Sequence, residues 1–431
     1  MEPRKASVAL LYNGKNATAQ VSPYLASFTY TDVSSGSSDT INVELNDRDR
    51  KWIGPWFPQK GDRLKPTIRT QNWDVDNIKT SFLCGAFCVD DFSFKGNPIK
   101  MSLDGVAIPA TSSFKSTKRT QTYEKTNLKE IGQKVAERAG IALFYEAKEM
   151  TIEKVEQNDQ DDCSFYNSLV TKCGLAMKIF NDKIVIFDEA TYEQKPTIAT
   201  LTEKDFDPNW SWNTSLAGTY TGVKYEYTNS KKNKTFTVEA GDGDRILTCN
   251  EAAENLTEAT AIALAALNSA NKGTTTLNIT LKGRWYIFAT ACVLIVGLGQ
   301  LSGKYYVEKA IHTLGDSGYK TALKLRKVEE RITEVKTQSS TVAERSKSKK
   351  SSSSKKSSGS SSSTPAKGDT YELKTTKKGY YTAAEAAAGQ VKPGNPSGVR
   401  RPGTYYVFNT SQGMLNLTTA KSVPGSWINP N

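Results

Sequence analysis

Residues 303–328 read GKYYVEKAIHTLGDSGYKTALKLRKV, and this stretch decides the fold class of the chain. Its two halves are rich in β-branched and aromatic residues, and the Gly, Asp and Ser between them are typical of a turn. The stretch therefore predicts two consecutive strands. A similar composition occurs in TTTLNITLKG at 274–283 and ATACVLIVGL at 289–298, which predict two more.

The surrounding region, 200–335, continues this pattern with one helical interruption. TYTGVKYEYTN at 219–229 and KKNKTFTVEA at 231–240 predict a hairpin, and the Ala-rich segment 251–271 predicts a helix. Together these elements indicate a small, closed or nearly closed β-unit that carries one helix.

The N-terminal part of the chain also predicts short strands, at 7–12, 24–30, 40–45 and 82–89. Between them, the stretch 46–68 contains two Pro-aromatic segments. Because Pro removes a backbone donor, we expect this stretch to be a surface excursion. Cys84 and Cys88 fall on the same face of a strand with a period of two, which indicates core packing and not a metal site.

A helical pattern appears between these two β-rich regions. TNLKEIGQKVAERAGI at 126–141 repeats apolar residues at helical spacing, with Thr126 or Asn127 as N-cap and Gly140 after the last turn. A second helix is predicted in DDCSFYNSLVTKCGL at 161–175, where Asp159 to Asp162 supply caps and first-turn negative charge. LAMKIFNDKIVIFDE then predicts a hairpin that turns at Asn181-Asp182.

The positive charge of the chain is unevenly distributed. The 57 Lys and Arg residues exceed the 45 acidic residues by 12, but the segments 341–368 and 369–431 hold most of that excess. The remaining 340 residues are nearly neutral. A nearly neutral body argues against a broad phosphate-binding face for nucleic acid.

Most catalytic arrangements are excluded by residue type. The single histidine, His312, rules out HExxH and two-histidine zinc sites, and we expect it to be a packed strand residue. Gly297, Gly299 and Gly303 precede a strand and not a helix, so they predict a turn and not a dinucleotide loop. Asp242 and Asp244 form a GDGD turn that lacks the other ligands of a calcium loop.

The sequence contains no recognisable signal for secretion or for membrane insertion. The N-terminus lacks the apolar run of a secretion signal, and the longest apolar stretch, 285–298, is too short for a membrane span. The six cysteines form no CxxC pair, and we expect them to be free thiols. No cofactor or metal is predicted.

The C-terminal part begins with a low-complexity Ser/Lys segment that we expect to be a flexible tether. An ordered composition returns at 369–431 and predicts two or three strands. Aromatic and amide side chains there are candidates for a cell-wall-binding groove, although in so small a domain such aromatics also serve as core. The candidates are Tyr405, Tyr406, Phe408, Asn416, Trp427 and Asn429.

Three segments carry a resemblance to a known family. They are KRTQTYEKTNLKEIGQKVAERAGI at 118–141, VEQNDQDDCSFYNSLVTKCGLAMKIFNDKIVIFD at 155–188, and the closing strands at 303–328. In this order they resemble the phage late control protein D family, the tail hubs related to the hub half of injection-spike proteins. The sequences at 402–418 and 424–430 are similar to a LysM-neighbouring element of tail and cell-wall proteins.

The resemblance implies a mainly β fold with an α+β insert, in which two small β-barrel-like domains form a trimeric ring. Its expected divisions are a first hub barrel (1–95), an α/β insert (96–190), a second hub barrel (191–337), a flexible linker (338–368) and a LysM-like module (369–431).

The resemblance also implies partners and a place of action. They are two further copies of the chain, the tail tube protein, the central spike protein, other baseplate proteins, the tape measure protein, and peptidoglycan for the module. The expected location is a virion or tail-like particle, a phage tail or a contractile bacteriocin, assembled in the bacterial cytoplasm.

Two alternatives remain open from the sequence. One is a cell-wall hydrolase whose C-terminal module targets the wall, although no acid/base pair of carboxylates supports it. The other is an adhesin of the tail, in which the linker and the module dominate. The main interpretation is a structural tail hub that joins the tail tube to the spike and is not an enzyme.

Overall fold

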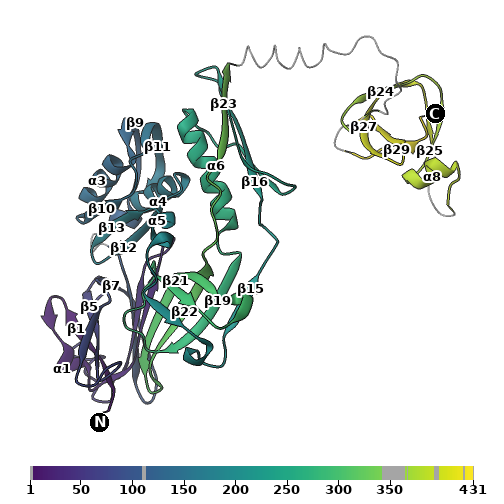
Figure 1. Cartoon of the computed structure of the whole chain (residues 1–431). Coiled ribbons are helices and arrows are strands. Elements are labelled where there is room, and N and C mark those ends of the chain that lie inside the picture. The colour runs from purple at the N-terminus through teal and green to yellow at the C-terminus, as the bar shows by residue number, and fades with distance from the viewer. Residues whose placement is uncertain are drawn as a thin grey trace. The chain divides into compact units, whose positions relative to one another are not determined.

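The chain divides into two units, a body (Met1–Ser346) and a C-terminal module (Lys347–Asn431) (Figure 1). The computed structural model describes residues 3–108, 113–341, 365, 367–392, 398–420 and 423–430. Most of the predicted linker, 338–368, lies outside these residues. Its first residues, 338–341, belong to a strand, so the ordered body extends further than the composition predicts.

The body is built on one large sheet to which both β-rich regions contribute. Its strand order is β15-β19-β22-β21-β3-β4-β8-β7-β5-β1-β2, with β20 and β14 continuing from β21 and β6 paired with β5. The strands from the N-terminal region are β1 (Lys5–Tyr12), β2 (Lys15–Asn16), β3 (Leu25–Val33), β4 (Thr40–Asn46), β5 (Arg63–Gln71), β6 (Lys79–Leu83), β7 (Phe87–Lys95) and β8 (Lys100–Val106). Those from the later region are β14 (Ala199–Leu201), β15 (Ser211–Thr214), β19 (Thr275–Lys282), β20 (Cys292–Ile295), β21 (Gly303–Gly315) and β22 (Gly318–Lys327).

The two regions meet at β3 and β21, which pair antiparallel from Lys309↔Val33 to Leu314↔Phe28. The two β regions therefore share one sheet, and the described strands close no barrel. The cause lies in the length of β21. Its first residues pair with β20 and its last with β3, so one continuous strand serves both regions.

Each region keeps its own hydrophobic core on this shared sheet. The first core gathers around Phe28, Tyr30 and Phe87, and the second around Tyr305, Leu277 and Leu325. All six side chains are buried. Burial of each large apolar side chain contributes about 1.5–3 kcal/mol, so both clusters stabilise the body.

Two boundaries of the first β region differ from the sequence expectation. β8 pairs with β4 and β7, so this region extends to Val106 and not to residue 95. The predicted surface excursion ends earlier than expected, because β5 begins at Arg63 and includes Pro66. Trp52, inside the excursion, is buried in the first core. Pro66 is tolerated because it lies between the residues of β5 that pair with β7, Arg63 and Leu64, and those that pair with β6, from Thr67 onward.

The α/β insert forms a separate layer that Figure 1 shows beyond one end of the large sheet. It contains α2 (Ser113–Ser116), β9 (Lys118–Asn127), α3 (Leu128–Ala139), β10 (Ala142–Glu146), β11 (Thr151–Asp161), α4 (Asp162–Lys172), β12 (Ala176–Phe180), β13 (Lys183–Phe187) and α5 (Glu189–Gln194). Both predicted helices and the hairpin are confirmed.

The local signals of the insert act as the sequence indicates. Asn127 is the N-cap of α3 and accepts a hydrogen bond from the Glu130 backbone N–H, and Gly140 ends the helix in the left-handed conformation. Asn181 and Asp182 both have positive φ, as the tight turn between β12 and β13 requires.

A second, smaller sheet carries the Ala-rich helix. Its order is β18-β16-β17-β23, formed by β16 (Gly222–Asn229), β17 (Lys234–Gly241), β18 (Ile246–Cys249) and β23 (Val335–Thr341). The helix, α6 (Leu256–Asn271), packs its buried residues against this sheet in a core of its own. The predicted hairpin and helix therefore form a unit beside the second β region and not part of a barrel.

The C-terminal module contains more strands than the composition predicts. One sheet has the order β24-β27-β28-β29, with β24 (Thr370–Leu373), β27 (Gly403–Ser411), β28 (Met414–Thr418) and β29 (Ser426–Ile428). A two-stranded sheet pairs β25 (Lys377–Gly379) with β26 (Gly398–Arg400), and α8 (Ala383–Ala388) lies between them in sequence.

Candidate functional site

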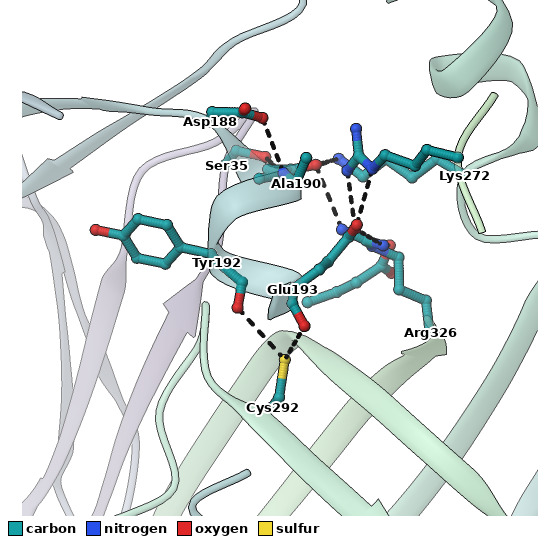
Figure 2. A network of polar contacts seen from close by, with 11 residues as sticks. Ser35, Asp188, Ala190, Tyr192, Glu193, Lys272, Cys292 and Arg326 are labelled. Atoms are coloured by element: carbon teal, nitrogen blue, oxygen red, sulfur yellow. Dashed lines mark hydrogen bonds and ion pairs between the residues drawn. The ribbon is translucent and has the colours of Figure 1, made fainter. Parts of the chain in front are cut away.

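A network of buried ion pairs joins α5, at the end of the insert, to the last strands of the large sheet (Figure 2). Arg326 on β22 is its centre, and its side chain is only 5% exposed. It contacts the carboxylates of Glu189, at 3.4 Å, and Glu193 on α5. It also reaches Glu308 on β21, at 3.5 Å. The Arg326 guanidinium lies 4.3 Å from the centroid of the Tyr306 ring.

Further cations complete the charge balance of this network. Arg331 donates two hydrogen bonds, of 2.8 and 2.9 Å, to the Glu193 carboxylate. Lys272, next to the end of α6, contacts Glu189 at 2.7 Å. Burial alone raises the pKa of Glu193, but the hydrogen bonds from Arg331 and the charge of Arg326 hold that pKa below its usual range. The carboxylate is therefore ionised and fully paired.

The geometry of α5 explains why both glutamates point to one place. Residues 189 and 193 are four apart, so they lie on the same face of the helix. Asp188 caps the helix by accepting from the Ala190 N–H at 2.8 Å, and the Cys292 thiol donates to the backbone carbonyls of Tyr192 and Glu193. The network thus ties the insert, the large sheet and the α6 unit together.

A second buried cluster lies where the insert hairpin meets β3. The Lys178 ammonium on β12 contacts Asp32, lies 3.3 Å from Asp39 and donates to the Val33 carbonyl at 2.8 Å. Asp32 also accepts from the Ala289 N–H at 2.7 Å. One cation between two carboxylates leaves the cluster with an excess negative charge. Burial and the neighbouring Asp32 raise the pKa of Asp39 to about 7.

His312 is a packed strand residue, as the sequence predicts. It is fully buried on β21, its Nδ1 lies 2.8 Å from the Tyr319 hydroxyl, and its ring stacks on Tyr30. Burial lowers the pKa of His312 to about 4, so the imidazole is neutral. The Thr321 hydroxyl also lies 3.4 Å from Nδ1, and both hydroxyl partners, Tyr319 and Thr321, are buried core side chains.

The aspartates at the start of α4 have a larger role than helix capping. Asp161 is the N-cap and accepts from the Ser164 N–H. Asp162 is buried and accepts two hydrogen bonds from Arg138 on α3, at 2.8 and 2.9 Å, and one from Arg119 on β9. Burial opposes its ionisation, but these partners hold the pKa of Asp162 below its usual range.

The structure places the six candidate residues of the module in different surroundings. Tyr405 packs against the main core of the module, and Trp427 belongs to a second small cluster with Tyr380 and Met414. Asn416 is buried and bonds the backbone N–H and carbonyl of Gly425, at 2.7 and 3.2 Å, so it holds a turn.

The other three candidates are half-buried. Tyr406 and Phe408 alternate along β27 with the core residue Val407, and the Lys367 ammonium lies 5.8 Å from the centroid of the Phe408 ring. Asn429 follows β29.

Comparisons with known proteins show that the chain is similar to phage baseplate proteins. The chain is 23% identical over 370 residues to the probable baseplate hub protein of Escherichia phage 186, covering 73% of this chain and 91% of that protein. It is 25% identical over 237 residues to the probable baseplate hub protein of Escherichia phage P2, covering 52% of this chain and 57% of that protein. These similarities show that this chain has the role of a structural tail hub. No protein-family model matches the chain.

Two solved structures of phage tail proteins have a fold similar to that of this chain. The 43 kDa tail protein of prophage MuSo2 from Shewanella oneidensis matches 75% of this chain and 98% of its own, with a TM-score of 0.58 and 12% identity. A tail protein from Neisseria meningitidis MC58 matches 74% of this chain and 96% of its own, with a TM-score of 0.57 and 14% identity. The expected mainly β fold class is confirmed.

The prediction that the chain is not an enzyme is confirmed by its relatives, which are probable baseplate hub proteins. All six cysteines are free, and Cys84, Cys88 and Cys292 are buried. Among the described residues, no group of three His, Cys, Asp or Glu side chains can hold a metal ion. In the same part of the chain, no helix is both long and apolar enough to span a membrane.

Sequence reasoning missed the ion-pair network and the Lys178 cluster of the tail hub. The sequence does place Glu189 and Glu193 four residues apart after a predicted strand. In a helix this spacing puts both side chains on one face, and it is the available signal for α5. Their partners on β22 and beyond are distant in the chain and carry no local mark. The sequence alone does not show that α5 and β22 lie side by side.

Proposed function

We propose that three copies of the chain assemble into a ring that joins the tail tube to the central spike. A hexameric tube must meet a threefold spike, and two β regions in each subunit offer six comparable edges from three chains. The partners in this proposal are the tail tube protein, the central spike protein, other baseplate proteins and the tape measure protein. The particle is a phage tail or a contractile bacteriocin, assembled in the bacterial cytoplasm.

The observation that carries this proposal is the open state of both ends of the large sheet. β1 pairs with β5 along its whole length but with β2 only at Leu11 and Tyr12. At the other end, β15 pairs with β19 alone among the described strands. An unpaired edge is a template for another strand, and head-to-tail pairing of two different edges closes into a ring.

The experiment is an image of the assembled particle together with the mass of the purified chain in solution. We expect three copies arranged with threefold symmetry at the end of the tail tube. A stable monomer inside native particles contradicts the proposal.

We also propose that the C-terminal module, which resembles a LysM-neighbouring element, binds the cell wall. The support is its separation from the body as a unit of its own and its half-buried aromatic side chains. The segment before the module is the expected tether. In this second role the chain binds the cell wall, as an adhesin does, while its body acts as the hub.

The test of the wall-binding role is co-sedimentation of the full chain with purified cell walls. We expect the full chain to sediment with the walls and a chain ending at Thr341 to stay in solution. Equal sedimentation of both contradicts the proposal.

A further inference from the structure

The segment 47–60, between β4 and β5, is a turn anchored in the first core. The Asp47 carboxylate is buried and accepts from the backbone N–H groups of Trp52 and Ile53, at 3.1 and 2.9 Å. The buried Trp52 ring meets Trp56 edge to face, with ring centroids 5.5 Å apart. A buried carboxylate and a buried indole therefore fix the conformation of this turn.

Two apolar side chains of the turn nevertheless face solvent. Ile53 is 43% exposed and Phe57 is 53% exposed. The Phe57 ring stacks on Phe94 with centroids 5.8 Å apart, and it meets Phe92 edge to face at 5.3 Å. An exposed apolar group held on a packed support is a feature of protein interaction sites.

Cations without an ion-pair partner belong to the same turn. Arg48, Arg50 and Lys60 are exposed, and none of the three forms a salt bridge to any residue that the structure describes. Lys51 is a fourth cation, and its ammonium lies 4.0 Å from the Asp49 carboxylate. Asp49 is the one exposed acidic residue of segment 47–60, which the structure describes in full. The turn therefore exposes an excess of positive charge.

The acids of the neighbouring strands do not remove this excess. Asp91 on β7 and Asp104 on β8 are opposite one another and alternate with Phe92, so they lie on the face away from Phe57. Asp90, at the bulge of β7, is the remaining exposed acid of this strand. With its charge included, the cations of the turn are still in excess.

The apolar side chains and the charge together define the chemistry of a partner. A protein surface with apolar side chains at its centre and carboxylates beside them buries Ile53 and Phe57 and pairs with the cations of the turn. Burial of an aromatic anchor supplies affinity, while complementary charge gives specificity and faster association. Aromatic residues and Arg are enriched at such interfaces.

An anionic membrane and nucleic acid are the competing partners, and the observations favour them less. A segment that binds a membrane buries apolar groups about 5–10 Å deep in the bilayer interface. The Phe57 ring instead lies against Phe92 and Phe94. Tight binding to DNA uses on the order of six to ten phosphate contacts, more than the cations of one turn can make.

We propose that Ile53 and Phe57, together with Arg48, Arg50 and Lys60, form a docking surface for another protein of the tail that presents apolar and acidic side chains. This inference rests on the hub role proposed above and names one contact of that role. The docking surface does not use the open edges of β1 and β15.

The first experiment identifies what lies against the docking surface in assembled tails. The photo-cross-linking residue p-benzoylphenylalanine replaces Phe57 in the full chain, the tails are irradiated, and mass spectrometry identifies the residues reached. The same replacement at Phe144 is the matched control, because Phe144 is 50% exposed and lies on β10 of the insert. We expect position 57, and not position 144, to cross-link to a different protein at a segment with apolar residues and more acidic than basic ones.

The second experiment measures binding of the purified full chain to that cross-linked protein. We expect Phe57→Ser and the triple variant Arg48→Gln/Arg50→Gln/Lys60→Gln each to bind about tenfold more weakly, a loss of roughly 1.4 kcal/mol of binding free energy. The variant Arg48→Lys/Arg50→Lys/Lys60→Arg keeps the charge and should retain most of the binding. Equal melting temperatures of all these chains separate loss of the docking surface from unfolding.

A second triple variant controls for the total charge of the chain. Lys15→Gln/Arg69→Gln/Lys79→Gln removes the same charge from exposed positions on β2, β5 and β6. Its binding should stay within about twofold of the unmodified chain, since distant exposed charges contribute little when salt is present.

The outcomes distinguish this inference from the hub role on which it rests. A position 57 that cross-links to no protein, to lipid, to nucleic acid or to a segment without an acidic excess overturns the inference. A cross-link to a second copy of the chain within a threefold ring also overturns it but leaves the hub role in place. Absence of the chain from assembled tails overturns both.

Discussion

Arg331 and Glu193 form a two-point contact, in which Nε and Nη2 of the arginine donate to the two carboxylate oxygens. Arg331 follows the last strand of the large sheet, whereas Glu193 lies on α5 at the end of the insert. With Arg326 on the same carboxylate, this contact fixes the insert to the sheet at a point where both Glu193 and Arg326 are buried.

Replacing Arg326 with Ala should destabilise the body strongly. The change leaves Glu189, Glu193 and Glu308 without their shared cation in a buried place. Removing one partner of a buried ion pair costs on the order of 3–5 kcal/mol. Urea unfolding followed by tryptophan fluorescence measures the change, with the exposed Arg69→Ala as control. A loss below about 1 kcal/mol, similar to that of a surface ion pair, contradicts the prediction.

Acid should destabilise the body through His312. The folded-state pKa of about 4 lies below the ordinary value of 6.5, so the unfolded chain binds the proton more readily. The contribution is fully present above pH 6.5 and is lost as the pH falls toward 4, by about 3 kcal/mol. Unfolding free energies measured from pH 7.5 to pH 4 should fall less steeply in His312→Phe. An unchanged slope in that variant would rule out this source.

Asp39 should act with the opposite sign in a similar pH range. Its folded-state pKa of about 7 is above the ordinary value of 3.8, so the folded chain binds this proton more tightly. Its protonation therefore stabilises the fold as the pH falls from about 7 to about 4. In Asp39→Asn this gain should disappear, so the stability of the unmodified chain relative to the variant should rise as the pH falls from about 7 to about 4. The exposed Asp242→Asn should show no such trend.

Gly132→Ala should destabilise the insert although Ala favours helices. A Cβ at this position of α3 would lie 2.1 Å from the Tyr166 hydroxyl, which donates to the Leu128 carbonyl. Overpacking of this kind costs about 1–3 kcal/mol, more than the gain of about 1 kcal/mol from helix propensity. Gly96→Ala is the control, because nothing lies within 4 Å of its added Cβ. Thermal unfolding compares the two, and equal melting temperatures would contradict the prediction.

Deleting residues 342–431 should leave assembly intact. The body retains all strands of the large sheet and its ion-pair network. Complementation of a phage that lacks the gene should therefore yield normal tails by electron microscopy, while their binding to cell walls declines. Failure to form tails would assign an assembly role to the module.

Local structure in the insert was predictable because its signals are short-range. The N-cap Asn127, the terminating Gly140 and the Asn181-Asp182 turn each act on neighbours within a few residues. The strands at 303–328 were predictable for the same reason, since their composition and the intervening turn identify them.

The arrangement of the sheet was not predictable in the same way. Strand composition does not state which strand is the neighbour of another, so β3 and β21 appeared to belong to separate barrels. The end of the predicted surface excursion at 46–68 was also placed too late because of Pro66. The rule that Pro avoids central strands does not show that β5 begins at Arg63. The sequence likewise contains Lys178, Asp32 and Asp39 without indicating that folding brings them together.

The pairing of Thr31 with Ile311 has a consequence for the synthesis of this protein. The ribosome releases the N-terminal strands long before β21 is synthesised. One edge of β3 therefore stays unpaired until most of the body has been translated. Contacts between such distant residues form slowly. Premature pairing between nascent chains is therefore a hazard, and a chain that stops before Lys309 lacks every β21 residue that pairs with β3.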